Sequence, residues 1–272
     1  MILHPQFLDS SNTSKKMNTS YVTVIPAYQT NLTQAERYAL LQLGRLEINN
    51  PTLVCPFHLD VTEYQLLLPN LQVERFDDAH FSSLAHYNRF VASPLFYKRF
   101  VDQYQWMLMH QLDAFLLENK VQYFISLGYD YFGAPWKVGF ENPLFLFNRP
   151  ILKKLFPRFH VGNGGLSLRN IPRTIDLLLR KKNHESHNYF LEDAFFGYWG
   201  NRDTSFTACP IDVASHFAFE TYPEHWFHES RQLPMGLHAY DKWSPDFYRP
   251  IIKSHHDLIE AEHPRLIQSI DV

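Results

Sequence analysis

The run Trp106-Met-Leu-Met-His-Gln-Leu-Asp-Ala-Phe-Leu-Leu117 is apolar apart from a short polar interruption that contains one acid, Asp113. A run of this kind, after a helix-like segment and before further strand-like sequence, predicts a buried strand of an α/β sheet. A lone carboxylate at the end of such a strand is costly to bury unless a partner compensates it. Open α/β sheets also bind their ligands at the carboxyl ends of strands. Asp113 is therefore either an acid that binds a metal or a substrate, or a structural acid that caps the next loop.

The composition describes a folded protein without an obvious polyanionic partner. The chain has 272 residues, of which 45% are hydrophobic and 16% aromatic, and this predicts a globular protein with a substantial core. The formal net charge is only -3, and the basic cluster Arg180-Lys-Lys182 is too short for a nucleic-acid site. No apolar run reaches the roughly 18 residues of a membrane helix. Nucleic-acid binding and a transmembrane segment are therefore not expected.

The two ends and the two cysteines bear on location and domain organisation. Residues 1–20 form a polar leader without the apolar core of a secretory signal. Cys55 and Cys209 lie within apolar segments, which predicts buried free thiols in a reducing compartment. A cytoplasmic protein is expected. No linker divides residues 20–250, so we expect one domain there, followed by a C-terminal tail or helix over residues 251–272.

Strand-like and helix-like segments alternate along the first half of the chain. The strand-like segments are 21–28, 52–56 and 71–76, and the helix-like segments are 32–48, with Asn31 or Thr33 as its cap, and 82–104, broken at Pro94. Such alternation predicts βαβ units and an α/β fold with a mostly parallel central sheet flanked by helices. No G-x-G-x-x-G motif follows the first strand, which excludes the usual dinucleotide-binding fingerprint.

The second half of the chain is less regular. Residues 137–160 are rich in aromatic residues and prolines without a clear period, and this predicts a loop region on the substrate side. A helix is expected from about Pro172 to Lys182, because proline suits the first helical turn. A further helix is expected to begin within Leu191–Phe196.

Several short motifs, taken together, resemble one family of proteins. They are Tyr87-Asn-Arg89, Gln111-Leu-Asp-Ala-Phe115, Gly133-Ala-Pro-Trp136, Val161-Gly-Asn-Gly-Gly-Leu-Ser-Leu-Arg169, Glu192-Asp193 and Gly236-Leu-His-Ala-Tyr240. The series is similar to that of glycosyltransferases of the GT-A fold. The residues within the motifs most closely resemble those of a glycosyltransferase-like family known mainly as a domain of unknown function. The resemblance covers about residues 20–250 and is specific as a set rather than motif by motif.

The resemblance implies a GT-A-like domain that moves a sugar from a nucleotide-diphosphate sugar to an acceptor hydroxyl. UDP is the expected nucleotide, and a glycan or another hydroxyl-bearing molecule is the expected acceptor. Asp113 and His238 would bind Mn²⁺ or Mg²⁺, which neutralises the charge of the departing diphosphate. In the usual GT-A motif two aspartates are separated by one residue, but here Gln111 takes the first position. Metal could therefore bind weakly or chiefly through the diphosphate, and metal-free catalysis stays open.

Two acids are candidates for the general base, Asp193 ahead of Glu192. A carboxylate beside the acceptor hydroxyl would take its proton as the anomeric carbon is attacked, and a single displacement of this kind inverts the configuration. The alternative is an acidic helix start favoured by the helix dipole. By resemblance, the donor would be bound by Pro26, Tyr28, Asn88, Arg89, Gln111, Asn163, Gly164 and Gly165. Each of these also has a structural alternative: a strand exit, a solvated helix residue or a tight turn.

Two other functions remain open at this point. A metal-dependent hydrolase could use Asp113, His238 and another acid, although no H-x-H or H-E-x-x-H spacing favours it. A catalytically silent relative that binds a nucleotide or carbohydrate is kept open by Gln111. Trp136, Trp226 and Tyr240 could stack on a sugar or belong to the core.

Overall fold

The computed structural model describes residues 20–140, 158–181 and 192–264. The predicted polar leader lies outside the described residues except for Ser20, and so does most of the irregular region expected over 137–160. Within the described part of the chain, no helix is long and apolar enough to cross a membrane.

The central sheet confirms the predicted α/β class. Its six strands lie in the order β3-β2-β1-β4-β9-β6. Their bounds are β1 Tyr21–Pro26, β2 Pro51–Pro56, β3 Gln72–Phe76, β4 Trp106–His110, β6 Tyr131–Phe132 and β9 Leu166–Asn170. The neighbours β3, β2, β1 and β4 are parallel, whereas β9 pairs antiparallel with β4 and β6. The sheet is therefore mostly parallel, with an antiparallel edge.

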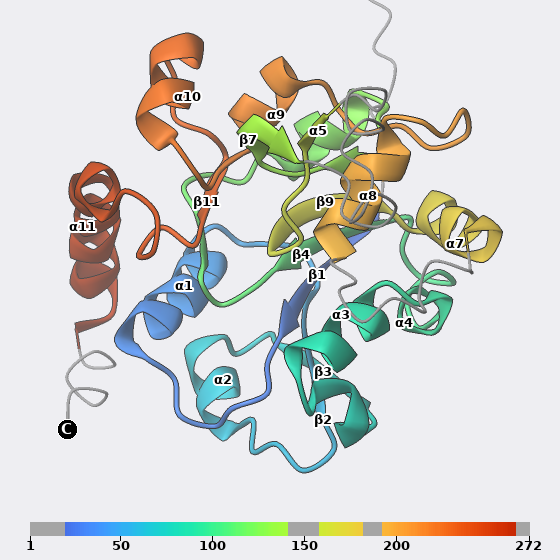
Figure 1. Ribbon diagram of the computed structural model, residues 1–272. Coiled ribbons are helices and arrows are strands. Elements are labelled where there is room, and N and C mark those ends of the chain that lie inside the picture. The colour runs from blue at the N-terminus through green and yellow to red at the C-terminus, as the bar shows by residue number, and fades with distance from the viewer. Residues whose placement is uncertain (1–19, 141–157, 182–191, 265–272) are drawn as a thin grey trace, which may run out of the picture.

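Helices cover both faces of this sheet, which explains why every residue of β1, β2 and β4 is buried. Figure 1 shows α1 (Gln34–Arg45), α2 (Thr62–Leu67) and α11 (Pro245–Glu262) on one side of the central strands. On the other side lie α3 (Leu84–Val91), α4 (Pro94–Lys98) and α7 (Ile171–Arg180). Pro172 lies in the first turn of α7, and Pro94 separates α3 from α4, both as predicted.

The prediction of one continuous strand over Trp106–Leu117 is wrong. The strand β4 ends at His110, the chain turns at Gln111, and β5 (Ala114–Leu116) belongs to a second sheet. The turn is closed by a hydrogen bond of 2.9 Å from the Ala114 amide to the Gln111 carbonyl. In the second sheet β5 pairs antiparallel with β11 (Gly236–His238), which pairs with β10 (Ala218–Phe219). This register puts His238 opposite Ala114, and therefore beside Asp113.

The remaining elements complete the layers. They are the 3-10 helix η1 Asp78–Phe81, the helices α5 Val121–Ser126, α8 Glu192–Gly200, α9 Ile211–Phe217 and α10 Pro223–Ser230, and the strands β7 Pro135–Phe140 and β8 Phe159–Val161. Of the two candidate caps for α1, Thr33 caps the helix, in a capping box with Glu36. Cys55 and Cys209 are free and buried, as predicted.

The expected domain boundary at residue 250 falls inside α11. This helix runs from Pro245 to Glu262 and packs along α1. The rings of Tyr38 and His256 stack at 3.8 Å between centroids, and Arg45 pairs with Glu262 at 3.0 Å. Of the two alternatives expected after residue 250, a tail or a helix, the described part is a helix, and it packs on the domain.

Candidate functional site

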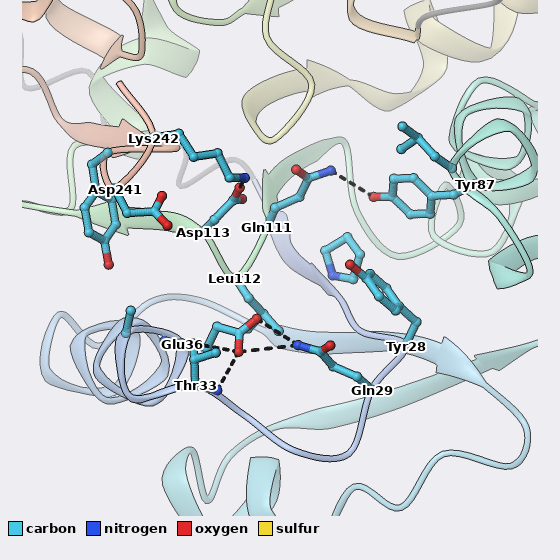
Figure 2. Close-up of a pocket in the computed structure, with 14 residues that line it drawn as sticks. Tyr28, Gln29, Thr33, Glu36, Tyr87, Gln111, Leu112, Asp113, Asp241 and Lys242 are labelled. Atoms are coloured by element: carbon cyan, nitrogen blue, oxygen red, sulfur yellow. Dashed lines mark hydrogen bonds and ion pairs between the residues drawn. The ribbon is translucent and has the colours of Figure 1, made fainter. Parts of the chain in front are cut away.

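A cavity of about 420 Å³ opens where the parallel strands β1 and β4 end (Figure 2). Its lining residues come from the β1 exit, the start of α1, α3, the turn after β4 and the segment after β11: Pro26, Tyr28, Gln29, Thr33, Ala35, Glu36, Leu84, Tyr87, Gln111, Leu112, Asp113, Tyr240, Asp241 and Lys242. The carboxyl edge of parallel strands is the usual ligand position in open α/β sheets. A wider hollow of about 1040 Å³ lies at the other end of α1, and no predicted site residue is among its described lining.

Asp113 is compensated by two cationic groups that come from β11 and the loop after it. Its Oδ2 accepts a hydrogen bond of 2.7 Å from Lys242 Nζ, and its Oδ1 lies 3.3 Å from His238 Nε2. Burial alone would raise the pKa of the Asp113 carboxyl, but His238 and Lys242 hold it well below its ordinary value. Asp113 is therefore an ionised acid at the rim of the cavity, and its carboxylate is held by side chains far away in sequence.

His238 is held between two carboxylates. Its Nδ1 lies 3.1 Å from Glu220 Oε1, and because a carboxylate only accepts, Nδ1 must be the donor. Burial alone would lower the pKa of His238, but the carboxylates of Asp113 and Glu220 raise it to about 9. The imidazole is thus cationic at neutral pH, and a metal ion would have to displace its proton.

The pair Asp113 and His238 fits two neighbouring ligands of one divalent cation. His238 Nε2 is buried and makes no hydrogen bond with any residue that the structure describes, although Asp113 Oδ1 is 3.3 Å away. Adjacent ligands at about 2.1 Å from a six-coordinate ion are about 3 Å apart. The described residues contain no group of three or more His, Cys, Asp or Glu side chains placed to hold a metal. Such an ion would therefore need further ligands from phosphate oxygens or water, as Mg²⁺ commonly has.

Gln111, at the position of the missing first acid, faces a tyrosine. Its amide nitrogen lies 3.4 Å from the Tyr87 hydroxyl, and both residues line the cavity. Asn88 and Arg89, which were expected to bind the donor, are half-buried on the same helix and do not line the cavity. Tyr28 and Pro26 do line it, and the Tyr28 side chain is 65% exposed.

The glycine-rich turn after β8 is shaped by the side chains around it. A Cβ at Gly164 would lie 2.0 Å from Glu192 Oε2, and one at Gly165 would lie 2.0 Å from His238 Nε2. Asn163 has a left-handed φ of 71° and accepts a 3.0 Å hydrogen bond from the Gly165 amide. All three residues are buried and none lines the cavity. The glycines thus make room for two functional candidates, and contact with a donor stays a prediction.

Glu192 forms a buried ion pair with Arg169 under this turn. Arg169 is fully buried, and it also donates to the Tyr97 hydroxyl at 2.6 Å and to the Gly164 carbonyl at 3.1 Å. Burial alone would lower the pKa of Arg169, but the Glu192 carboxylate raises it, so the guanidinium stays charged. The Glu192 carboxylate is committed to this pair, which joins α8 to β9, α4 and the glycine turn.

Removal of Arg169 is expected to destabilise the protein strongly. Arg169→Ala leaves the buried Glu192 carboxylate and the Gly164 carbonyl without their partner, at a cost of ~3–5 kcal/mol in the free energy of unfolding. Urea unfolding measures this loss. Arg249→Ala is the matched control, because it removes an exposed pair with Asp246 and should change stability little. Equal stability of the two variants would show that the Arg169 pair does not hold the site together.

Asp193 has a different environment from Glu192. It is the second residue of α8, and its Oδ1 accepts a 2.7 Å hydrogen bond from the Ala194 amide. Burial, and then the charge of Glu192, raise the pKa of the Asp193 carboxyl to about 7; Glu220 adds to this, while the Ala194 amide and His238 oppose it. Asp193 has no ion-pair partner among the described residues, so its carboxylate is available to exchange a proton near neutral pH.

Three residues that hold the candidate site residues in place were not singled out by the sequence. Lys242 holds Asp113, Glu220 holds His238, and Arg169 holds Glu192. Lys242 follows His238 by four residues, so its nearness to the C-terminal motif was a usable signal. Glu220 lies between motifs and has no such signal. Arg169 ends a quoted motif, but a lone arginine within an apolar strand gives no hint of its partner.

The fold, α/β with a mostly parallel central sheet, matches that of solved glycosyltransferase structures of the GT-A type. The solved structure of mouse xyloside xylosyltransferase 1 in its apo form matches with a TM-score of 0.51 at 15% identity, over 80% of this chain and 97% of that chain. The structure of galactosyltransferase LgtC in complex with donor and acceptor sugar analogs gives a TM-score of 0.48 at 11% identity, over 79% and 86% of the two chains. At such identity the likeness to the xylosyltransferase establishes the fold alone.

The sequence comparison adds the family. Residues 70–238 match the family described as "Protein of unknown function (DUF5672)", and since the match covers more than half of the chain, the protein belongs to this family. No curated protein is significantly similar to the chain in sequence.

Proposed function

We propose that the protein is a glycosyltransferase that moves a sugar from a nucleotide-diphosphate sugar, with UDP as the expected nucleotide, to an acceptor hydroxyl. The observation that carries the proposal is the convergence of Asp113 and Lys242, which line the cavity beyond β1 and β4, with His238, which contacts Asp113 beside the cavity. Asp113 is far from His238 and Lys242 in the sequence, so the fold itself brings these groups together. Together they offer cationic donors and a cation-binding carboxylate where the diphosphate of a donor would lie.

The charge of the cavity favours a donor that arrives with a cation. Among its described lining residues, Glu36, Asp113 and Asp241 are acids and Lys242 alone is basic. A diphosphate would meet a surplus of negative charge there unless a divalent cation came with it. When bound, such an ion would neutralise the charge that develops on the leaving diphosphate. Asp113 and His238 would hold it, and Lys242 would donate hydrogen bonds to phosphate oxygens.

The aromatic rim and the acids of α8 take the other roles. Tyr28 is largely exposed at the cavity and offers its ring for stacking on the base of the nucleotide. Asp193 takes the proton of the acceptor hydroxyl, since its carboxyl has a pKa near neutrality and forms no ion pair with a described residue. Glu192 serves to fix α8 through Arg169. With Asp193 as the base, we expect a single displacement with inversion.

Thermal unfolding in the presence of nucleotides tests the proposal. A ligand that binds the folded state raises the melting temperature, by an amount that grows with the logarithm of the ligand concentration once this exceeds Kd. We expect UDP and UDP-sugars, with Mn²⁺, to stabilise the protein more than uridine does, and Tyr28→Ala to reduce this shift. Tyr123→Ala, which removes a tyrosine that is 53% exposed outside the cavity, is the control. No stabilisation by any nucleotide diphosphate would refute the proposal. Stabilisation without transfer to any acceptor would instead indicate a silent binding relative.

A further inference from the structure

Glu220 is a half-buried acid that the roles above leave unexplained. It follows β10, and its side chain is 15% exposed. Its Oε1 accepts from His238 Nδ1 at 3.1 Å, and its Oε2 accepts from Trp136 Nε1 at 3.3 Å. Its backbone carbonyl accepts from the Tyr248 hydroxyl at 3.1 Å. Both carboxylate oxygens are thus in use, and the residue is held from three directions.

The contact with Glu220 decides which nitrogen of His238 is offered to a ligand. Because Nδ1 donates to Glu220, the lone pair of the neutral ring lies on Nε2, the nitrogen 3.3 Å from Asp113 Oδ1. A carboxylate behind a histidine is the common support of a metal-binding imidazole, since it fixes the tautomer and ring orientation and raises ligand basicity. Without Glu220 the Nδ1 proton would lose its acceptor, and the neutral ring could adopt the other tautomer.

Two glycines of the turn after β8 make this arrangement possible. A Cβ at Gly162 would lie 1.8 Å from the ring of Trp136, and a Cβ at Gly165 would lie 2.0 Å from His238 Nε2. The turn therefore packs against both ends of the chain Trp136–Glu220–His238. The ring of His238 is confined by backbone on one side and oriented by Glu220 on the other.

We propose that Glu220 is a positioning residue for cation binding: it holds His238, with Trp136 holding Glu220 in turn, so that Nε2 and Asp113 Oδ1 are presented together to a divalent cation bound to the donor diphosphate. The inference rests on the proposed function and adds to it a residue that touches neither donor nor acceptor. Its effect is confined to the cation and does not extend to the nucleotide base.

Titration of Mn²⁺ by electron paramagnetic resonance, on the full chain with saturating UDP, tests this role directly. Glu220→Ala is expected to weaken Mn²⁺ binding by roughly 10- to 100-fold. Glu220→Gln keeps an acceptor for Nδ1 but loses the charge, so we expect a smaller loss of about fivefold. Glu224→Ala, on α10, removes a nearby acid that does not contact His238 and should bind Mn²⁺ as the wild type does. UDP binding in EDTA should be equal in all four proteins.

The outcomes separate the inference from the function on which it rests. Wild-type Mn²⁺ affinity in folded Glu220→Ala overturns the role of Glu220 while leaving the glycosyltransferase proposal intact. A loss of UDP binding in EDTA also overturns it, because the residue would then support the whole cavity. If Glu220→Ala does not fold, unchanged affinity in Glu220→Gln overturns it. Failure of wild-type protein to bind UDP with or without Mn²⁺ refutes both.

Discussion

Asp113→Asn is expected to abolish turnover and the cation-dependent part of nucleotide binding, while the fold stays intact. Asparagine keeps the shape of the side chain but removes the charge that Lys242 and His238 surround. Of the two side chains that would bind the cation, Asp113 supplies the only carboxylate, and the substitution removes it. The backbone carbonyl of Asp113, which accepts from the Ala239 amide at 3.0 Å, is unaffected by the substitution. Transfer assays and UDP titrations with and without Mn²⁺ measure the effect.

Asp241→Asn is the matched control for this variant. Asp241 also lines the cavity, next to Lys242 in sequence, so the substitution removes the same charge from the same place. It should retain most of the activity, because Asp241 does not contact His238 or Lys242 in any ion pair of the described residues. A folded Asp113→Asn protein with undiminished, Mn²⁺-dependent transfer would remove Asp113 from the mechanism.

The fold was predictable where local pattern and burial coincide. The β-branched and apolar residues of Tyr21–Pro26 and Pro51–Pro56 are buried on both faces, and such runs are typical of a parallel sheet that helices cover on both sides. The same reasoning failed at Trp106–Leu117, because β4 and β5 are equally buried although they belong to different sheets. Hydrophobic periodicity reports burial and does not report which strand is the partner. The pairing of β5 with β11 is a long-range contact that no local signal announces.

Part of the candidate site could be singled out from the sequence: the acids, the C-terminal histidine, and the cavity-lining residues Pro26, Tyr28 and Gln111. Asp113 and His238 were linked through a resemblance between motifs, and the structure places their side chains 3.3 Å apart. Their supporting residues could not be found in this way. Glu220 is defined by its contact with His238, and Arg169 by a buried carboxylate 23 positions further along the chain. Charge compensation in the interior depends on tertiary packing, and a single sequence carries no record of it.

The glycine-rich turn fits two interpretations: its glycines could make room for a bound ligand or for side chains of the protein itself. Glycine permits close approach of backbone to any group, and the sequence alone suggested that the group is a ligand. In the structure the groups that approach are Glu192 Oε2 at Gly164 and His238 Nε2 at Gly165. The turn is therefore where the ion pair of α8 and the histidine of β11 pack against the same backbone. This packing brings Asp193 within electrostatic reach of His238.

Asp193→Asn is expected to separate chemistry from binding. If Asp193 takes the proton of the acceptor, its loss should lower the transfer rate by roughly 10²- to 10⁴-fold. Donor affinity should change little, because a group that acts in the transition state contributes little to ground-state binding. Single-turnover transfer rates and UDP-sugar titrations measure the two quantities. Glu192→Gln is a poor mimic of this effect, since it disturbs the buried pair with Arg169 and should lower stability.

The pH dependence supplies a second signature of the same residue. The pKa of the Asp193 carboxyl is raised to about 7, chiefly by burial and next by Glu192, so the base is protonated in acid and the transfer rate should rise with pH through about 7. A folded-state pKa above the ordinary value contributes stability at low pH, and that contribution is lost as the pH rises through about 7. The transfer rate of Asp193→Asn should therefore no longer rise with pH through about 7, and the variant should be more stable than wild type above neutrality. If Asp193→Asn keeps both the wild-type rate and this rise with pH, Asp193 is no more than an acidic residue at the start of a helix.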